Sequence, residues 1–118
     1  MKYKNIFLTG STGILGKPLL KKLLNEGHNV YALSRNKIHD DFLTSNNAKI
    51  INGELISDGI YEQLKDHSIE AIFHVAGANK KCQKDPSSMF RTNIEGTKQM
   101  LELGNKLKIE KFIYTSSA

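Results

Sequence analysis

Five short apolar segments recur along the chain, and stretches with helical spacing of apolar residues lie between them. We predict strands at residues 5–9, 29–33, 49–52, 71–75 and 111–115. Most of these segments are rich in Ile, Val, Phe or Leu and lack polar alternation, which is typical of strands buried on both faces of a parallel sheet. Five strands alternating with about four helices predict a doubly wound α/β fold, and right-handed crossovers favour the strand order 3-2-1-4-5.

The stretches between the predicted strands differ in how clearly they predict helices. The first has an apolar stripe and Gly27 as its predicted end, and the stripe consists of Ile14, Leu15, Leu19, Leu20, Leu23 and Leu24. The second, residues 37–47, is weaker, and the third, residues 58–67, can begin at Asp58 as N-cap. The last is long, and its Asp85-Pro86 pair suits the start of a helix that runs through Lys106.

Composition excludes several classes of protein. The 118 residues give room for one domain, and no apolar run approaches the ~18 residues of a membrane span. Cys82 is the only cysteine, so no internal disulfide forms, which fits a reducing, cytoplasmic compartment. The charge of 17 − 12 = +5 is scattered, so we expect no nucleic-acid partner and no membrane partner. Most of these charges suit a solvated surface, and one or two suit an anionic ligand.

The stretch TGSTGILG, residues 9–16, joins the first predicted strand to the first predicted helix. Gly10 permits a tight turn, Gly13 lets the backbone approach a ligand, and Gly16 permits close packing of the helix. Free N–H groups at the helix start then face a pyrophosphate, helped by the helix dipole. The pattern and its context predict dinucleotide binding, and a purely structural turn is the alternative.

The same stretch resembles the Thr-Gly-x-x-Gly-x-x-Gly motif of the extended short-chain dehydrogenase/reductases, which include sugar-nucleotide epimerases, dehydratases and reductases. Four later stretches resemble family motifs in the same order, namely GELISD (53–58), IFHVAGA (72–78), NIEGT (93–97) and FIYTSSA (112–118). The resemblance covers all 118 residues. It implies that residues 1–118 are the N-terminal part of a Rossmann-like NAD(P)-binding domain, truncated and without the substrate domain.

The resemblance also implies which residues contact the cofactor. They lie in the glycine stretch, after the third strand, at the ends of the fourth and fifth strands and in the last helix. Glu54 stands where the family usually has an aspartate that meets the adenine. The set consists of Gly10, Thr12, Gly13, Ile14, Leu15, Gly16, Glu54, Leu55, Val75, Ala76, Gly77, Asn93, Thr115 and Ser116.

The choice between NAD and NADP depends on the end of the second strand. An NAD site usually has an acidic residue there, bonded to the ribose 2′-hydroxyl. This chain has Ser34 followed by Arg35, and a guanidinium suits a 2′-phosphate through paired hydrogen bonds. NADP is therefore favoured over NAD. The alternative is that Arg35 is a solvated loop residue.

Catalysis in the family uses a Ser or Thr followed, some tens of residues later, by Tyr-x-x-x-Lys. The resemblance places the serine at Ser117, where it would hold the substrate oxygen, and the alternative is a strand-end cap. No Tyr-x-x-x-Lys follows Ser117. The earlier YEQLK, residues 61–65, lies before the fourth strand, so we expect Tyr61 to pack on the sheet and Lys65 to be solvated.

The sequence therefore predicts the NAD(P)-binding part of an oxidoreductase, epimerase or dehydratase that acts on a hydroxyl or carbonyl group. The resemblance implies a sugar nucleotide or similar small molecule as substrate, without choosing one, and the 118-residue chain alone is expected to be inactive. The alternative is a non-catalytic NAD(P)-binding sensor or regulatory module. The four histidines have no metal-site spacing, and His74 suits a packed, hydrogen-bonded role. The apolar edge strand at 111–115 predicts that the isolated chain is marginally stable, or that it forms a homodimer through that edge or through the last helix.

Overall fold

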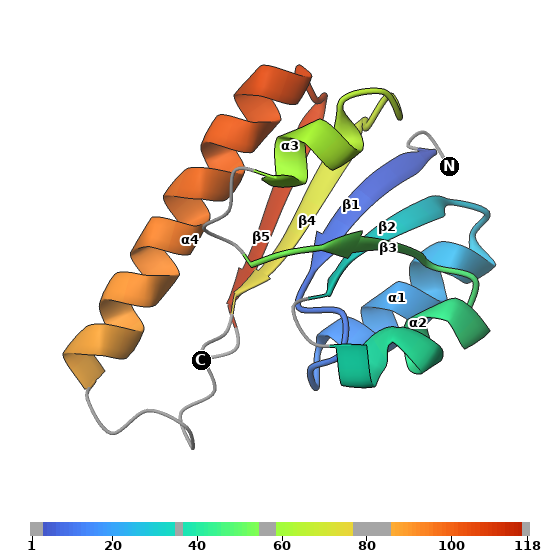
Figure 1. Ribbon diagram of the computed structural model, residues 1–118, viewed down its shortest axis with the longest axis horizontal. Coiled ribbons are helices and arrows are strands. Elements are labelled where there is room, and N and C mark those ends of the chain that lie inside the picture. Colours follow the sequence, from blue (N-terminus) through green and yellow to red (C-terminus); the bar gives the residue numbers. More distant parts are fainter. Residues whose placement is uncertain (1–3, 35–36, 55–58, 77–85, 117–118) are drawn as a thin grey trace.

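The computed structural model describes residues 4–34, 37–54, 59–76 and 86–116, which form a five-stranded parallel sheet between two layers of helices (Figure 1). The strand order is β3-β2-β1-β4-β5, and every hydrogen-bonded pair is parallel. The predicted α/β class and strand order are thus confirmed. Along the chain the elements are β1 (Asn5–Thr9), α1 (Gly16–Asn25), β2 (Asn29–Ser34), the short 3-10 turn η1 (Lys37–His39), α2 (Asp40–Ser45), β3 (Lys49–Asn52), α3 (Gly59–Leu64), β4 (Ala71–Ala76), α4 (Pro86–Leu107) and β5 (Lys111–Ser116).

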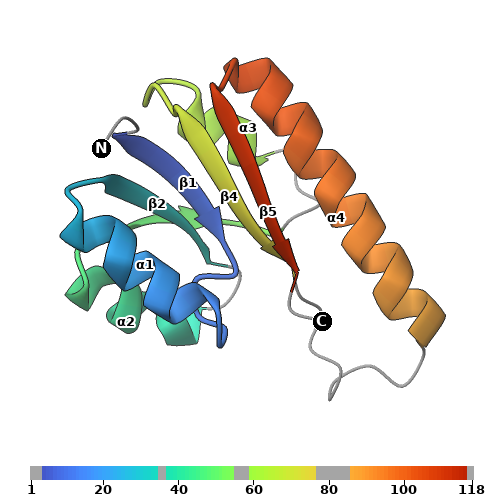
Figure 2. The same cartoon turned by 180° about the vertical axis from the view of Figure 1, so that it is seen from behind.

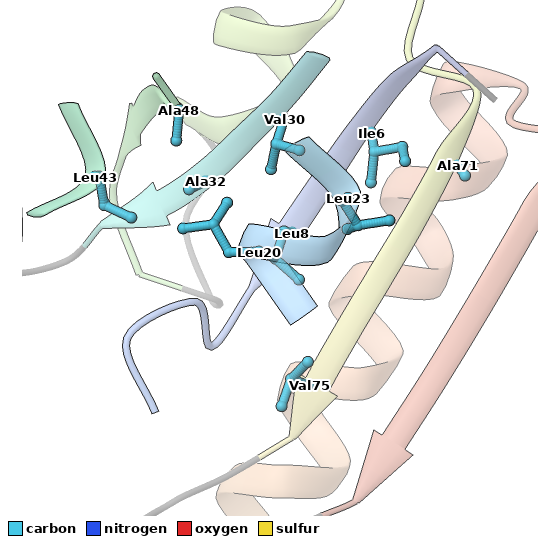
Figure 3. Close-up of a cluster of buried hydrophobic side chains, with 10 residues drawn as sticks. All are labelled: Ile6, Leu8, Leu20, Leu23, Val30, Ala32, Leu43, Ala48, Ala71 and Val75. Atoms are coloured by element: carbon cyan, nitrogen blue, oxygen red, sulfur yellow. The ribbon is translucent and has the colours of Figure 1, made fainter. Parts of the chain in front are cut away.

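The two faces of the sheet carry separate hydrophobic cores, because side chains of a strand alternate between its faces. In β1, Ile6 and Leu8 pack in the core under α1 and α2, whereas Phe7 packs in the core under α3 and α4. The two pairs of helices lie on opposite sides of the sheet (Figure 2). All three side chains are buried, and each contributes roughly 1.5–3 kcal/mol relative to an exposed position. Figure 3 shows the core under α1 and α2, which consists of Ile6, Leu8, Leu20, Leu23, Val30, Ala32, Leu43, Ala48, Ala71 and Val75.

Helix α1 begins later than the apolar spacing predicts. Leu20 and Leu23 are buried as expected, but Ile14 and Leu15 precede the helix and are 93% and 46% exposed. Their place in the predicted stripe is therefore wrong, because the chain uses residues 10–15 to turn out of β1 before helical geometry starts. The predicted end is confirmed. Gly27 has φ +94°, a conformation that glycine adopts without strain, and its N–H bonds the Leu24 carbonyl.

Strand β5 lies at one edge of the sheet, as predicted, with β4 as its neighbour. Its Phe112 and Ile113 are half-buried, and Tyr114 is 47% exposed. Helix α4 lies beside β5 (Figure 2), and its buried Met100 and Leu103 share a core with Phe112. No helix in the described part of the chain is long and apolar enough to cross a membrane.

Candidate functional site

The candidate site lies where the carboxyl ends of β1 and β4 meet. The chain leaves β1 toward α1 on one face of the sheet, whereas α4, the helix that follows β4 in the chain, covers the other face (Figures 1 and 2). In open α/β sheets the crevice outside such a reversal is where ligands bind. The geometry of the residues around this crevice therefore decides what it can hold.

Two glycines make the turn after β1 sterically tight. Gly10 has φ +70°, and a Cβ added there would lie 2.6 Å from the Val75 carbonyl oxygen in β4. A Cβ at Gly16 would lie only 1.7 Å from the Gly10 carbonyl oxygen, so α1 packs on the backbone of the turn itself. Gly13 differs, since the nearest atom to its Cβ position is the Gly10 oxygen at 3.5 Å. The backbone is thus closed at Gly10 and Gly16 and open to approach at Gly13.

The turn ends at a helix start that suits an anion. Leu15 is the N-cap of α1 and has no side-chain capping bond, the Lys17 N–H bonds the Gly13 carbonyl at 3.1 Å, and the first turn of the helix holds no acidic residue. The N–H groups and dipole of such a start attract negative charge. Beside it, the Ser11 hydroxyl is buried and has no hydrogen-bond partner among the described residues. An open backbone at Gly13, an uncapped helix start and an unpaired hydroxyl fit a diphosphate group.

A buried polar pair joins β1 to β4 beside this turn. The Thr9 Oγ1 and His74 Nδ1 atoms are 2.7 Å apart, and the Val75 N–H donates to Thr9 Oγ1 at 3.2 Å. Thr9 and His74 are each 1% exposed, and burial lowers the pKa of His74 below its ordinary value. The Tyr114 ring lies 5.6 Å from the His74 ring, measured between centroids. His74 is packed and hydrogen-bonded as predicted, and the pair fixes the strand ends from which Gly10 turns.

A second polar pair lies at the carboxyl end of β2. The Ser34 hydroxyl donates to Asp40 Oδ1 at 2.7 Å, and Ser34 is 7% exposed. The Ser34 carbonyl accepts a bond from the Gly53 N–H, so the end of β2 is tied to the chain that follows β3. Glu54 is the next residue and is exposed. Asp40 is not among the predicted site residues, and its one signal in the sequence is an acidic residue six positions after Ser34, in the first turn of α2.

The other predicted cofactor residues are placed unevenly. Thr12 is half-buried in the glycine turn, whereas the Val75 side chain is buried beneath Gly10 and belongs to the core. Thr115 is exposed in β5, next to Val75 in the strand register. The backbone of Ala76, Asn93 and Ser116 lies in β4, α4 and β5 respectively. Four predicted residues lie outside the described residues, and these are Arg35, Leu55, Gly77 and Ser117.

The early Tyr-x-x-x-Lys match has the structural role expected of it. Tyr61 packs in the core under α3 and α4, with Lys106 Nζ 5.6 Å from the ring centroid. Lys65 is exposed, and Glu62 lies 2.6 Å from its Nζ and raises the pKa of the lysine. Neither side chain belongs to the crevice. Within the described ranges, no group of three or more His, Cys, Asp or Glu residues could hold a metal ion.

A parallel sheet in the order 3-2-1-4-5, with a glycine turn at the crevice between β1 and β4, defines a protein of the Rossmann fold class. Comparison with known families narrows this class. Residues 6–118 match the family described as NAD dependent epimerase/dehydratase, and the chain belongs to that family.

Individual relatives cover several activities. A Synechocystis sp. protein provisionally named a dihydroflavonol 4-reductase is 34% identical, over 94% of this chain and 32% of its own length. The UDP-glucose 4-epimerase of Klebsiella pneumoniae is 29% identical, over 96% of this chain and 88% of that sequence. The crystal structure of gox2253 matches 94% of this chain with a TM-score of 0.81 and 28% identity. This chain spans about a third of the Synechocystis protein and 33% of the gox2253 chain.

Proposed function

We propose that this chain binds a nicotinamide dinucleotide, with the diphosphate on the glycine turn and the nicotinamide toward the ends of β4 and β5. The observation that carries the proposal is the turn itself, which is open at Gly13 and leads into an uncapped helix start. Membership of an NAD-dependent family supports it. The contacts proposed from the resemblance are the glycine-turn residues, Glu54 and Leu55 near the adenine, residues 75–77 of the crevice, Asn93, Thr115 and Ser116.

We further propose that the chain is the cofactor-binding part of an enzyme that acts on a hydroxyl or carbonyl group. A bound nicotinamide would supply hydride transfer, and Ser117 would hold the substrate oxygen. Relatives named for UDP-glucose and for a sterol carboxylate support a sugar nucleotide or similar small molecule as substrate. Because the chain spans 32% of the length of the Synechocystis relative, we expect it to bind the cofactor without turnover.

The test of cofactor binding is a fluorescence titration of the chain with NADH and NADPH. Saturable quenching or enhancement by either cofactor supports the proposal, and no binding of either contradicts it.

The alternative of a non-catalytic sensor is distinguished from an enzyme by sequencing the gene beyond the Ala118 codon. A reading frame with Tyr-x-x-x-Lys a few tens of residues on favours the enzyme, whereas a stop codon favours the binding module. A cytoplasmic location, supported by the single cysteine, completes this proposal.

Arg35 tests the proposed preference for NADP. Arg35→Asp should weaken NADPH binding by roughly 1–3 kcal/mol more than NADH binding, because a charged hydrogen bond to the 2′-phosphate is lost. Titration of both cofactors against wild-type and variant chains measures the difference. Lys37→Asp makes the same change in charge at an exposed position two residues on and serves as control. Equal losses of NADPH and NADH affinity in Arg35→Asp would contradict the proposed contact between Arg35 and the 2′-phosphate.

We also propose a homodimer formed through the β5 edge or through α4. Ile94 and Leu101 lie two turns apart on α4 and are 43% and 49% exposed, so they share one side of the helix. Light scattering should therefore give twice the mass of the chain. A double Ile94→Glu and Leu101→Glu variant that becomes monomeric assigns the contact to α4, and one that stays dimeric assigns it to β5. A wild-type monomer at micromolar concentration contradicts the proposal.

A further inference from the structure

An acidic residue stands immediately behind the end of β2. Ser34 is the last residue of this strand, and its hydroxyl donates to Asp40 Oδ1 at 2.7 Å. Asp40 is the first residue of α2 and is half-buried, and Ser34 is buried and bonded through its carbonyl to the Gly53 N–H. The serine is thus fixed at the strand end, and its hydroxyl is directed to the carboxylate.

The position matters because of what a dinucleotide places there. In Rossmann sites an acidic side chain about 20 residues after the glycine turn accepts a bond from the ribose 2′-hydroxyl. Such a carboxylate also repels a phosphate on the 2′ oxygen. This chain has a serine at that point, but its hydroxyl is held by a carboxylate one hydrogen bond further back. A negative charge therefore lies one hydrogen bond behind the strand end at which the ribose of a bound dinucleotide would lie.

We propose that Asp40 is a specificity-determining residue, whose carboxylate behind Ser34 disfavours a phosphate on the 2′ oxygen of a bound adenosine ribose. The inference rests on the proposed dinucleotide function and adds to it a group that opposes Arg35. Other charges nearby would attract or repel a 2′-phosphate, according to their sign. Lys37 and Asp41 are exposed, and Lys17 Nζ lies 5.1 Å from the Phe42 ring centroid in α2. Asp40 is distinguished from Asp41 by its hydrogen bond to the strand end.

The experiment compares Asp40→Asn with the matched variant Asp41→Asn in the full 118-residue chain. Each removes one negative charge from the first turn of α2, but it is the Asp40 carboxylate that accepts the Ser34 hydroxyl, and an asparagine oxygen can still accept it. The probes are ADP and 2′,5′-ADP, which differ by the 2′-phosphate and need no nicotinamide site. Their dissociation constants are measured by calorimetry, and thermal melting of each variant checks that the fold is intact.

Asp40→Asn should tighten 2′,5′-ADP binding about three- to tenfold, the order expected from removing one nearby charge in a partly solvated site. ADP should change less than about twofold, and Asp41→Asn should leave both ligands within about twofold. If Asp40→Asn does not fold, Asp40→Ser supplies a second uncharged variant with the same expected result.

Three results would overturn the assignment. Equal tightening by the two variants would assign the effect to net charge. Weaker binding of both probes would make Asp40 a structural residue. An unchanged ratio of the dissociation constants of ADP and 2′,5′-ADP would show that Asp40 has no role in specificity. Each of these results leaves dinucleotide binding in place. Failure of the wild-type chain to bind either probe would overturn the proposed function together with this inference.

Discussion

Gly16→Ala is expected to disrupt both the glycine turn and dinucleotide binding. The added Cβ would lie 1.7 Å from the Gly10 carbonyl oxygen and 2.8 Å from the Ser11 Cα. These are backbone atoms of a turn fixed against β4, so α1 must shift as a whole. Overpacking costs typically 1–3 kcal/mol, and we expect a loss of about 3 kcal/mol because no flexible side chain can yield. Urea unfolding measures the stability, and NADH titration measures the binding.

Gly13→Ala is the matched control, and it should separate binding from folding. Its Cβ would have the Gly10 oxygen at 3.5 Å as its nearest neighbour, which is ordinary contact, so stability should change by less than about 1 kcal/mol. The methyl group would nevertheless stand where a diphosphate approaches the backbone, and NADH affinity should fall at least about tenfold. A Gly13→Ala chain that binds NADH like wild type would contradict the proposal that the diphosphate approaches the backbone at Gly13. A Gly16→Ala chain of wild-type stability would contradict the packing.

Thr9→Val is expected to destabilise the chain by about 1–3 kcal/mol. Valine keeps the shape of threonine but removes the hydroxyl, so the buried His74 Nδ1 loses its partner. An unsatisfied buried group costs roughly 1–3 kcal/mol. Thr9→Ser retains the hydroxyl and should cost no more than about 1.5 kcal/mol for the lost methyl. Equal losses in the two variants, measured by urea unfolding, would mean that packing rather than hydrogen bonding decides stability at this position.

His74 should make the stability of the chain depend on pH. Burial lowers its pKa in the folded state, whereas the unfolded chain takes up a proton near the ordinary value of 6.5. The stability that depends on neutral His74 is therefore fully present above about pH 6.5, and it is lost as the pH falls toward the folded-state pKa. Unfolding curves between pH 7.5 and pH 5 measure it. His74→Gln should have a flatter pH profile, and an unchanged profile would assign the dependence to other groups.

The fold could be predicted because its signals are local in the sequence. Apolar runs without polar alternation, such as residues 71–75, indicate strands covered on both faces, and their order then follows from the handedness of the crossovers. The start of α1 could not be predicted in the same way. Ile14 and Leu15 continue the helical spacing of apolar residues, but they are exposed in the turn. Spacing alone does not distinguish an apolar loop residue from a core residue.

The candidate site was predictable only in part, for a related reason. The glycine turn is one continuous stretch, so its pattern is visible in the sequence. The Thr9–His74 bond joins residues 65 positions apart and depends on the register of β1 against β4. The Ser34–Asp40 bond depends on how η1 returns the chain to the strand end. Pairs of this kind are set by tertiary packing, and residue type alone does not reveal them.

The central place of β1 also has a consequence for the synthesis of this protein. β2 and β3 follow β1 in the chain, so these three strands can pair while the remainder is still being made. β4 contains the Val75 carbonyl against which Gly10 packs, and it pairs with the other side of β1, where Thr9 lies opposite His74, 65 positions later in the chain. Contacts between distant residues form late because closing long loops costs entropy. A nascent chain that ends before β4 should therefore lack a shaped crevice, and cofactor can assist folding only after β4 has left the ribosome.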